Sequence, residues 1–461
     1  MDHVLIKAIT YNNNSKVLFE LLSSQPDAIW LDSCQPHSQQ GRYDIISACP
    51  DHIVETFGKY STITSDKKSY TTSRDPFDIA NDLLEPLKGY RASKELKSPF
   101  VAGILGYFGY DLGRPYFKID NDTKVASVLP DMRIGRYLWG LVVDHSEKTA
   151  HLNFHPQCSI LLKETILKIF ERFDRVKLND QRSFALDNPF QPQTLKIDYL
   201  EKISKIQQYI AAGDCYQVNL AQHFSASYKG NIFTAYLALR EKMPSPYAAF
   251  WSWGNSKGVM SLSPERFLQV RDGHAETKPI KGTVSRGSND NEDYDNAQLL
   301  LNSEKDLAEN LMIVDLLRND LSKNAQLGSV SVPNLFALES FPNVHHLVST
   351  VTAQLKSDVS PFKLLKDCFP GGSITGAPKQ RAMQVIEELE PLKRNVYCGS
   401  IGYINADETM DTNIAIRTVI ADGQTLHCWG GGGITGDSDP LKEYQESLSK
   451  ISILLKTIEN I

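Results

Sequence analysis

The sequence predicts an α+β protein in which large antiparallel β-sheets pack as a sandwich with helices on the outside. Strand-like segments follow one another in runs, without the regular strand–helix alternation that predicts a parallel sheet. Between those runs lie segments with apolar residues at helical spacing, which predict amphipathic helices that cover the sheets. The 461 residues are enough for a large core and two lobes.

Composition narrows the class of protein. Hydrophobic residues make up 41% and charged residues 23%, values that are typical of globular proteins. A net charge of −6 with interspersed acids and bases argues against a nucleic-acid-binding surface. The seven cysteines are scattered without CxxC spacing, which argues against zinc or a disulfide framework and favours a reducing compartment. The first residues lack signal-peptide features and no apolar run reaches ~18 residues, so we expect a cytoplasmic protein.

Residues 1–185 are expected to form an N-terminal lobe. The pattern predicts a helix at 17–22, strands at 28–33 and 41–48, and a hairpin from 137–143 and 150–154. The glycine-rich stretch 100–111 is typical of a strand that another backbone approaches closely. The polar, proline-containing stretch 181–194 predicts a linker, so that 186–461 form the second domain.

The second domain opens with a predicted helix. Asp198 is its expected N-cap, Glu201 completes a capping box, and Gly213 ends the helix. Alternation from Tyr216 to Ala221 predicts a half-buried strand. The remaining predicted elements are strands at 248–253, 259–262, 267–270, 275–280 and 413–420, and helices at 305–321, 378–389 (with Pro378 in its first turn) and 440–458 (capped by Asp439).

Glu265 and Lys281 lie on two predicted strands joined near Asp272-Gly273. A two-residue loop would pair Glu265 with Ile280 and leave Lys281 on the other face, whereas a three-residue loop or a bulge would put Glu265 opposite Lys281. In the second case, an acid that can protonate a leaving hydroxyl and an amine that can attack carbon would face one substrate. An exposed cross-strand ion pair is the alternative.

Acidic pairs with i, i+3 spacing occur on two predicted helices. Asp306 and Glu309 form one pair, and Glu443 and Glu446 form the other. If the pairs converge, they make the oxygen-rich site that Mg²⁺ prefers. Acidic residues near helix N-termini are also favoured by the helix dipole, so each pair taken alone is more typical of a solvated helix end.

Two glycine-rich stretches could present free backbone amides. The stretch 370–379 leads into a helix, but Ala377-Pro378 stands where a P-loop requires Lys-Ser/Thr, so it is not a nucleotide site. Its amides would still suit a carboxylate. Gly430 to Gly433 form the second stretch, for which anion contact and tight packing are both open. Arg417, in the predicted strand 413–420, could clamp a carboxylate or face water.

The ordered motifs resemble those of the chorismate-utilising enzymes, closely over 195–455 and more loosely before that. The resemblance rests on 213–220 (GDCYQVNL), 263–266 (SPER), 305–316 (KDLAENLMIVDL), 346–349 (HLVS), 371–379, 414–418 (IAIRT) and 431–433. Within the family, Lys281 in Pro279-Ile280-Lys281-Gly282-Thr283 resembles the aminodeoxychorismate-forming branch, because the other branches usually have alanine there. Gln217 stands where isochorismate-forming members carry a lysine base, which speaks against water as the nucleophile. The anthranilate-forming branch, in tryptophan biosynthesis, is the alternative.

The resemblance implies a set of roles. Glu265 would protonate the departing C4 hydroxyl of chorismate and Lys281 would attack C2, giving a covalent intermediate from which ammonia makes 4-amino-4-deoxychorismate, the precursor of 4-aminobenzoate and folate. Mg²⁺ would be held by Glu309 and Glu446, assisted by Asp306 and Glu443. The implied substrate-binding residues are Gln217, Thr283, His346, Gly372, Ser373, Thr375, Gly376, Lys379, Tyr403, Arg417, Gly431, Gly432 and Gly433.

The resemblance also implies partners. No Gly-x-Cys-x-Gly glutaminase motif occurs here, so ammonia would come from a separate glutamine amidotransferase subunit or from free ammonia. Ser33, Tyr43, Pro246 and Tyr247 correspond to the segments that form a tryptophan pocket in this family. Asp32 departs from the usual glutamate of the feedback motif, so that feedback inhibition is not expected from this resemblance.

Overall fold

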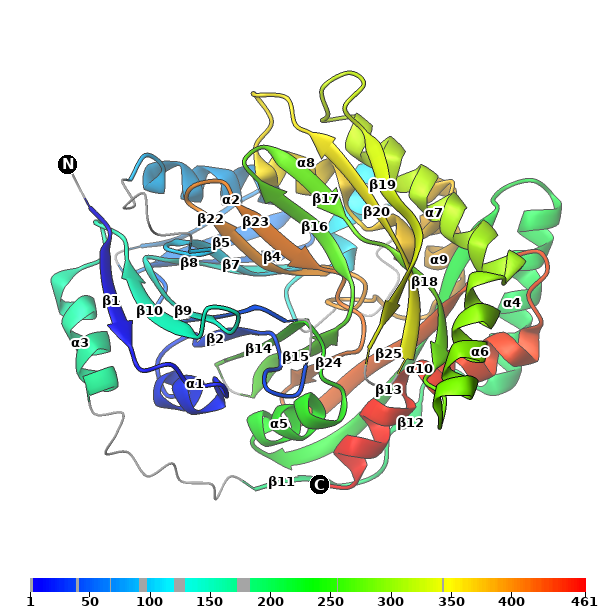
Figure 1. Cartoon of the computed structure of the whole chain (residues 1–461), viewed down its shortest axis with the longest axis horizontal. Helices are drawn as coiled ribbons and strands as arrows, with labels where there is room; N and C mark the ends of the chain where they lie inside the picture. Colours follow the sequence, from blue (N-terminus) through cyan, green and yellow to red (C-terminus); the bar gives the residue numbers. More distant parts are fainter. Residues whose placement is uncertain are drawn as a thin grey trace.

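The chain forms two large antiparallel sheets, so the predicted α+β class is confirmed (Figure 1). The computed structural model describes residues 3–38, 41–66, 68–90, 98–119, 129–171, 183–254, 256–341 and 344–461. The sheets share one hydrophobic core, since Tyr107 of the second sheet makes edge contact with Trp251 of the first. Arg133 of the second sheet lies over the ring of the same Trp251, 4.6 Å from its centroid.

The first sheet has 13 described strands, and both predicted domains contribute to it. In spatial order they are β1 (Leu5–Ile9), β10 (Thr149–Phe154), β9 (Trp139–Asp144), β3 (Tyr43–Ser47), β2 (Ile29–Asp32), β14 (Tyr247–Trp253), β15 (Lys257–Ser263), β24 (Thr418–Asp422), β25 (Thr425–Ile434), β13 (Gln217–Gly230) and β11 (Phe184–Leu186), with β12 (Gln191–Pro192) and β21 (Gly376–Ala377) also paired to β13.

The second sheet has 12 described strands. They run β18 (Ile280–Ser285), β20 (Val344–Gln354), β17 (His274–Thr277), β16 (Arg266–Arg271), β23 (Met410–Asn413), β22 (Ser400–Asn405), β7 (Gly103–Phe108), β8 (Met132–Tyr137), β4 (His52–Phe57), β5 (Tyr60–Ser65) and β6 (Ser69–Thr72), with β19 (Ser331–Ser340) also paired to β20.

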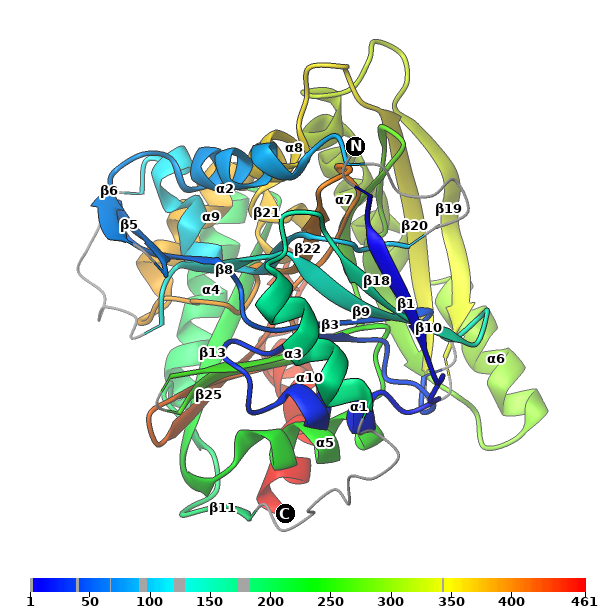
Figure 2. The same ribbon diagram turned by 90° about the vertical axis from the view of Figure 1, so that its left-hand side faces the viewer.

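Helices lie around the two sheets, as predicted (Figures 1 and 2). They are α1 (Lys16–Leu22), α2 (Pro76–Leu84), α3 (Ile160–Glu171), α4 (Lys196–Ala211), α5 (Ile232–Lys242), α6 (Asp290–Leu301), α7 (Glu304–Ser322), α8 (Pro361–Cys368), α9 (Lys379–Leu389) and α10 (Pro440–Glu459), with short 3-10 helices η1 (Glu85–Leu87), η2 (Tyr110–Phe117) and η4 (Gly372–Ile374). Two of them position the site: α7 packs on β20 and α10 packs on β25. Among the described residues, no helix combines the length and the apolar composition that crossing a membrane requires.

The predicted boundary near residue 185 does not divide one sheet from the other. β2 pairs with β14 in the first sheet, and β7 pairs with β22 in the second, so each sheet joins residues from both sides of that boundary. The predicted linker was wrong for the residues that are described, because β11 and β12 lie within it and pair with β13. Residues 181 and 182 lie outside the described residues.

Local patterns placed most elements correctly, with small errors at the ends. The α1 helix, the β9–β10 hairpin, α7 and the Asp439 cap of α10 are confirmed. Asp198 is not an N-cap, since α4 begins two residues earlier and its N-cap Leu195 makes no side-chain bond. Pro378 is the N-cap residue of α9 and precedes its first turn. The close approach predicted for β7 is confirmed, because a Cβ on Gly106 would lie 2.3 Å from the Arg133 carbonyl oxygen.

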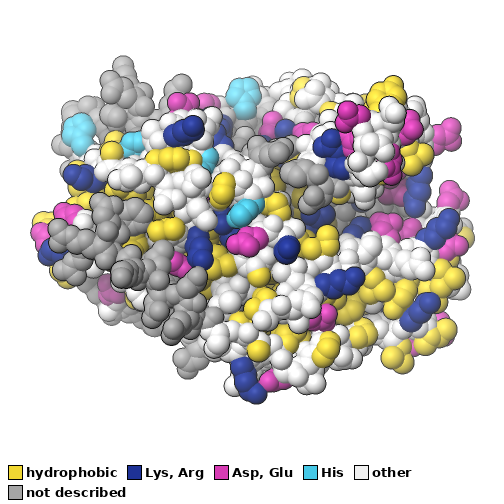
Figure 3. Space-filling view, turned by 60° about the horizontal axis from the view of Figure 1, so that its bottom comes forward, with side chains coloured by type: hydrophobic (Ala, Val, Ile, Leu, Met, Phe, Trp, Pro, Cys, Tyr) yellow, Lys and Arg dark blue, Asp and Glu magenta, His cyan; other side chains and the backbone are white. Residues whose placement is uncertain are grey.

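The charge distribution agrees with the composition. Among the described side chains on the face seen in Figure 3, acidic and basic groups are interspersed.

Candidate active site

The hairpin that connects Glu265 to Lys281 has the two-residue loop. Arg271 pairs with His274 across Asp272-Gly273, and both loop residues have positive φ, 51° and 73°, as a primed hairpin turn requires. The predicted continuous strand at 275–280 was wrong, because β17 ends at Thr277 and β18 begins at Ile280. Both then pair with the same strand, β20. A regular hairpin would thus have left Lys281 on the wrong face.

A bulge resolves that mismatch. The partner of β18 on β20 shifts by one residue between Ile280 and Thr283, and Gly282 between them has φ +78°. A Cβ on Gly282 would lie 2.8 Å from Leu300, so only glycine fits the backbone there. The Lys281 ammonium donates to the Ser373 carbonyl oxygen at 3.4 Å. The bulge lies in the β18–β20 pairing and not in the Glu265 hairpin itself, and Lys281, which is next to it, reaches the same loop as Glu265.

Glu265 lies in the loop between β15 and β16 and is 5% exposed. Burial raises the pKa of its carboxyl to about 7, although hydrogen bonds from the Ser373 hydroxyl and the Ile280 amide and the charge of Lys281 oppose the rise. Since the pKa lies near neutrality, the group can both hold and release a proton at physiological pH.

The pKa of Lys281 is shifted in the opposite direction, below its ordinary value. Burial lowers the pKa of its amine, Lys450 lowers it further, and Glu309, Glu265 and Glu446 oppose the change. A lowered pKa increases the neutral, nucleophilic fraction of the amine. Ser373 therefore joins an acid and an amine whose pKa values have moved toward each other.

The loop that carries Ser373 is closely packed. The Thr375 hydroxyl donates to the Gly371 carbonyl oxygen at 3.0 Å, so its hydrogen bond holds the loop. A Cβ on Gly372 would lie 2.6 Å from Leu316, and one on Gly376 would lie 2.2 Å from the Gln217 carbonyl oxygen. The two glycine positions thus have little room for a side chain, and Ser373 is the member whose hydroxyl faces Glu265.

Lys379 does not offer a free charge to this site. Its buried ammonium donates to Asp320 at 2.6 Å and to the Cys368 carbonyl oxygen at 2.8 Å. A buried ion pair of this kind neutralises both groups within the protein. A role for Lys379 in substrate binding stays a prediction that its observed position does not support.

Arg417 is not inside a strand, as was predicted, but in a crossover between the two sheets. The predicted strand 413–420 is broken, because β23 ends at Asn413 in the second sheet and β24 begins at Thr418 in the first. Arg417 has φ +50°, which turns its side chain away from the strand direction. Its guanidinium has no hydrogen-bond or ion-pair partner among the described residues, and burial lowers its pKa. A partly buried cation without an anion is a natural site for a carboxylate.

His346 lies beside Arg417. Its Nδ1 lies 2.8 Å from the Thr283 hydroxyl oxygen. Burial lowers the pKa of His346 to about 4, and the charge of Arg417 acts in the same direction. The imidazole is therefore neutral at pH 7 and can only contribute hydrogen bonds there.

Gln217 is a buried amide without a partner. It is fully buried, and neither its Nε2 nor its Oε1 has a hydrogen-bond partner in the part of the chain that the structure describes. Leaving such a group unsatisfied is costly, so water or a bound molecule that completed its hydrogen bonds would stabilise it. A Cβ on Gly433 would lie 2.1 Å from Gln217 Nε2, so the glycine makes room for this side chain.

The second glycine run is part of strand β25 rather than a loop. Gly431 to Gly433 pair with Ala221 to Asn219 on β13. The described ladder with β24 on the other edge stops at Cys428, so that edge of the glycine run faces the Arg417 crossover unpaired. Tight packing is confirmed, since a Cβ on Gly431 would lie 2.5 Å from the Leu220 carbonyl oxygen. Contact between these amides and an anion stays a prediction.

Predicted carboxylates of the two helices come near each other at Lys305, with lysines among them. Lys305 Nζ lies 3.8 Å from Glu309 and 3.4 Å from Glu443. Burial raises the pKa of Glu309, with Asp306 and Glu443 adding to the rise and Lys281 and Lys305 opposing it. No three acidic, histidine or cysteine side chains among the described residues stand close enough to hold a metal as they are. The donor set is nevertheless all oxygen and negatively charged, which fits the chemistry of Mg²⁺.

Sequence reasoning missed these lysines. Lys305 and Glu309, and likewise Glu446 and Lys450, stand four residues apart, a spacing that predicts helix-surface ion pairs. That signal was available before the fold was known, but which helices face each other was not.

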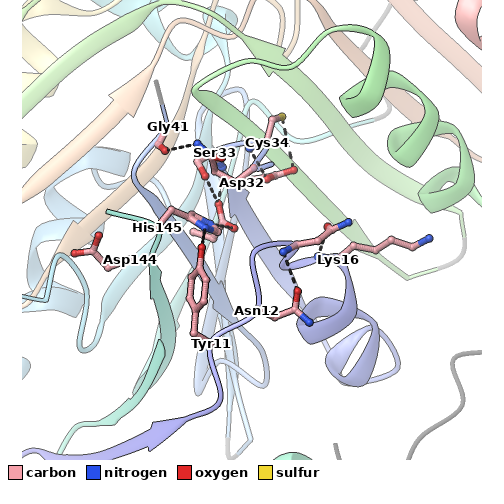
Figure 4. Close-up of polar contacts among 12 residues, drawn as sticks. Tyr11, Asn12, Lys16, Asp32, Ser33, Cys34, Gly41, Asp144 and His145 are labelled. Atoms are coloured by element: carbon pink, nitrogen blue, oxygen red, sulfur yellow. Dashed lines mark hydrogen bonds and ion pairs between the residues drawn. The ribbon is translucent and has the colours of Figure 1, made fainter. Parts of the chain in front are cut away.

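Apart from the Lys281 site, a second site, here called the second cavity, has a volume of about 300 Å³ and lies between the two sheets, and Lys281 is not among its lining residues. Tyr43, Pro246 and Tyr247 of the predicted tryptophan pocket line it. Ser33, also predicted for that pocket, is not among the lining residues, and its backbone N–H and hydroxyl donate to Asp44 at 2.7 Å (Figure 4). Tyr403, predicted to touch substrate beside Lys281, lines this cavity instead.

Comparisons with known proteins agree with the geometry. The family model described as chorismate binding enzyme matches residues 28–456. Aminodeoxychorismate synthase component 1 of Escherichia coli (strain K12) is 43% identical over 459 residues, covering 100% of this chain and 99% of that protein. Anthranilate synthase component 1 of Acetivibrio thermocellus is 32% identical, covering 96% of this chain and 92% of that protein. The crystal structure of anthranilate synthase component I from Streptococcus pneumoniae TIGR4 superposes with a TM-score of 0.79 at 31% identity, covering 90% of this chain and 92% of that one.

Proposed function

The chain belongs to the chorismate binding enzyme family, and from that premise we propose that it converts chorismate and ammonia to 4-amino-4-deoxychorismate, as an aminodeoxychorismate synthase component 1. The observation that carries the proposal is the meeting of Glu265 and Lys281 at Ser373. An acid with a pKa of about 7 and an amine with a lowered pKa are the two groups that the reaction needs.

Binding of the substrate uses the groups left without partners. Arg417 supplies an uncompensated positive charge for one carboxylate, and Gln217 supplies a buried amide that can donate and accept. Amides of the Gly371–Gly376 stretch and of Gly431 to Gly433 are the further contacts that we propose. Glu309 and Glu446, assisted by Asp306 and Glu443, would hold Mg²⁺, which when bound supplies positive charge that offsets a substrate carboxylate.

The chemistry is a displacement in two halves. Protonated Glu265 gives its proton to the C4 hydroxyl, which leaves as water, while the neutral Lys281 amine bonds to C2 and both ring double bonds shift toward C4. Ammonia then bonds to C4, both double bonds shift back, and the C2–nitrogen bond to Lys281 breaks. The lysine thus splits one difficult substitution into two easier ones.

Ammonia in this scheme comes from a partner. We propose a separate glutamine amidotransferase subunit as its source, with free ammonium as a substitute in the test tube. The second cavity is proposed to bind tryptophan through Tyr43, Pro246 and Tyr247, with Ser33 outside its lining. A reducing cytoplasm, in which the seven free cysteines stay as thiols, is the expected location.

The test is the product made from chorismate, Mg²⁺ and ammonium. The expected product is 4-amino-4-deoxychorismate, which retains the pyruvyl group and shows no release of pyruvate. Formation of anthranilate with release of pyruvate would instead identify the anthranilate-forming activity, which the 32% identical relative makes the second candidate. Repeating the assay with glutamine and an amidotransferase subunit tests the partner separately.

A further inference from the structure

One lysine joins the acidic ends of two helices. Lys305 lies in the first turn of α7, and its ammonium lies 3.8 Å from Glu309 on the same helix and 3.4 Å from Glu443 on α10. Glu443 is 5% exposed, whereas the Lys305 side chain is 55% exposed. The buried carboxylate is therefore neutralised by a cation that remains in contact with water.

Glu446, which follows Glu443 by three residues on α10, is also paired with a lysine. Lys450 Nζ lies 2.8 Å from Glu446 and 3.3 Å from the Gly431 carbonyl oxygen. A Cβ placed on Gly432 would lie 3.4 Å from Glu443 and 3.5 Å from Lys450, so these groups share one small region beside β25. The acids of this region are thus each turned toward an ammonium, and within the described residues no three of them form a ready-made metal site.

Electrostatics explains why the lysines are there and why they can leave. A carboxylate as buried as Glu443 is costly without a partner, and the one hydrogen bond that it accepts from Ser438 at 2.8 Å does not supply positive charge. A lysine head is a flexible, strongly hydrated point charge that can withdraw into water at small cost. A divalent cation bound to the same oxygens would repel an ammonium 3.4–3.8 Å away from them.

We propose that Lys305 is an internal counterion that occupies the acidic site in the metal-free protein and must be displaced when Mg²⁺ binds, so that this lysine sets the metal affinity. The inference rests on the proposed function for the identity of the metal site. Without metal, the Lys305 ammonium offsets the negative charge of the carboxylates. Because Lys305 and Mg²⁺ compete for the same carboxylates, Mg²⁺ binds more weakly than it would to the four carboxylates alone.

The test is Mg²⁺ binding by isothermal titration calorimetry with the full chain, without chorismate. Lys305→Met keeps the length of the side chain and removes its charge. We expect this variant to bind Mg²⁺ about fivefold to tenfold more tightly, the size expected for one half-exposed charge contact. Lys305→Arg keeps the charge and should stay within about twofold of the unchanged protein. Lys168→Met is the matched control, because Lys168 forms an i, i+4 pair with Glu164 at 3.9 Å on the distant α3.

A second measurement separates competition from a merely structural role. Without metal, Lys305→Met should melt at a lower temperature than the unchanged protein, and saturating Mg²⁺ should remove that difference. Equal or weaker Mg²⁺ affinity in Lys305→Met, with normal binding by the unchanged protein, would overturn the inference alone. Absence of Mg²⁺ binding in both proteins would overturn the metal assignment of the proposed function and this inference with it.

Discussion

Two clusters of buried charge in this protein differ in whether the charges have partners. Around the second cavity, Asp32 receives hydrogen bonds from Arg240 at 2.8 and 3.0 Å and from the Tyr236 hydroxyl at 2.7 Å. Asp44, close to it, is held by His145 at 2.8 Å and by Ser33, and although burial favours its neutral form these contacts lower its pKa (Figure 4).

The Lys281 site has the opposite character. Arg417 and Gln217 lack partners among the described residues, and Glu265 keeps a raised pKa despite its hydrogen bonds. The satisfied cluster would be destabilised by the loss of one partner, whereas the unsatisfied one has groups that a ligand could pair with. Perturbed and unpaired groups therefore mark the site of chemistry more sharply than burial or charge alone.

Removing the nucleophile is expected to have the largest effect. Lys281→Ala should lower the rate of product formation at least about 10⁴-fold, because the covalent route is lost. Intact-mass analysis with chorismate should show an adduct on the unchanged protein and none on the variant. Lys278→Ala is the control, since Lys278 is three residues away and pairs only with Glu339 at 3.6 Å among the described residues. An adduct that persists in Lys281→Ala would refute the role of Lys281.

Glu265→Gln should lower the rate by about 10²- to 10⁴-fold, the range for loss of a general acid. In the unchanged protein, activity should fall as pH rises above about 7, because Glu265 must be protonated. Its folded-state pKa lies above the ordinary value of 4.5, so its contribution to stability is present at low pH and is lost as pH rises from 4.5 through 7.

Urea unfolding checks this sign. At pH 8 the Glu265→Gln variant should be more stable than the unchanged protein, by on the order of 1–3 kcal/mol, because the amide carries no charge to bury. At pH 4 the two proteins should be nearly equal in stability. A pH–rate profile that does not fall above pH 7 would remove Glu265 as the acid.

Arg240→Met tests the satisfied cluster. It leaves the fully buried Asp32 without its cation, so the free energy of unfolding should fall by about 3 kcal/mol. Chemical denaturation with urea measures this change, and kcat should be affected little in the protein that remains folded. A variant as stable as the unchanged protein would show that Asp32 does not depend on this pair.

Arg417→Met is the counterpart in the unsatisfied cluster. Arg417 has no partner among the described residues, so its removal leaves no buried group unpaired. The free energy of unfolding should therefore change by less than about 1 kcal/mol. The KM for chorismate should rise about 100-fold, as for the loss of a charge-assisted contact with a carboxylate. Marked destabilisation with an unchanged KM would reverse the comparison between the two clusters.

Gln217→Leu should give the smallest effect. Replacing an unsatisfied buried amide by an apolar side chain of similar size should leave stability unchanged or raise it by up to about 1 kcal/mol. The KM for chorismate should rise about tenfold, as for the loss of one neutral hydrogen-bonded contact. Thermal unfolding and steady-state kinetics on the same preparation measure both, and a loss of stability above about 2 kcal/mol would show that the amide has a partner within the fold.

The sequence by itself determined most helices and strands and the candidate residues for the chemistry. Periodicity located α1, α7 and α10, runs of strands indicated antiparallel sheets, and ordered motifs identified Glu265, Lys281 and Arg417 as candidates. These features are local, since a helix stripe, a cap or a motif is decided by residues close together in the chain.

Only the tertiary structure decided how those residues meet. The bulge at Gly282 depends on the pairing of β18 with β20. The Arg417 crossover depends on β23 joining one sheet and β24 joining the other. The contact between Lys305 and Glu443 depends on α7 facing α10. Each is set by contacts between residues far apart in sequence, and a one-residue change of register reverses which face a side chain occupies. For that reason Lys281 could be named from its neighbours in the chain, but its place beside Glu265 could be known only from the fold.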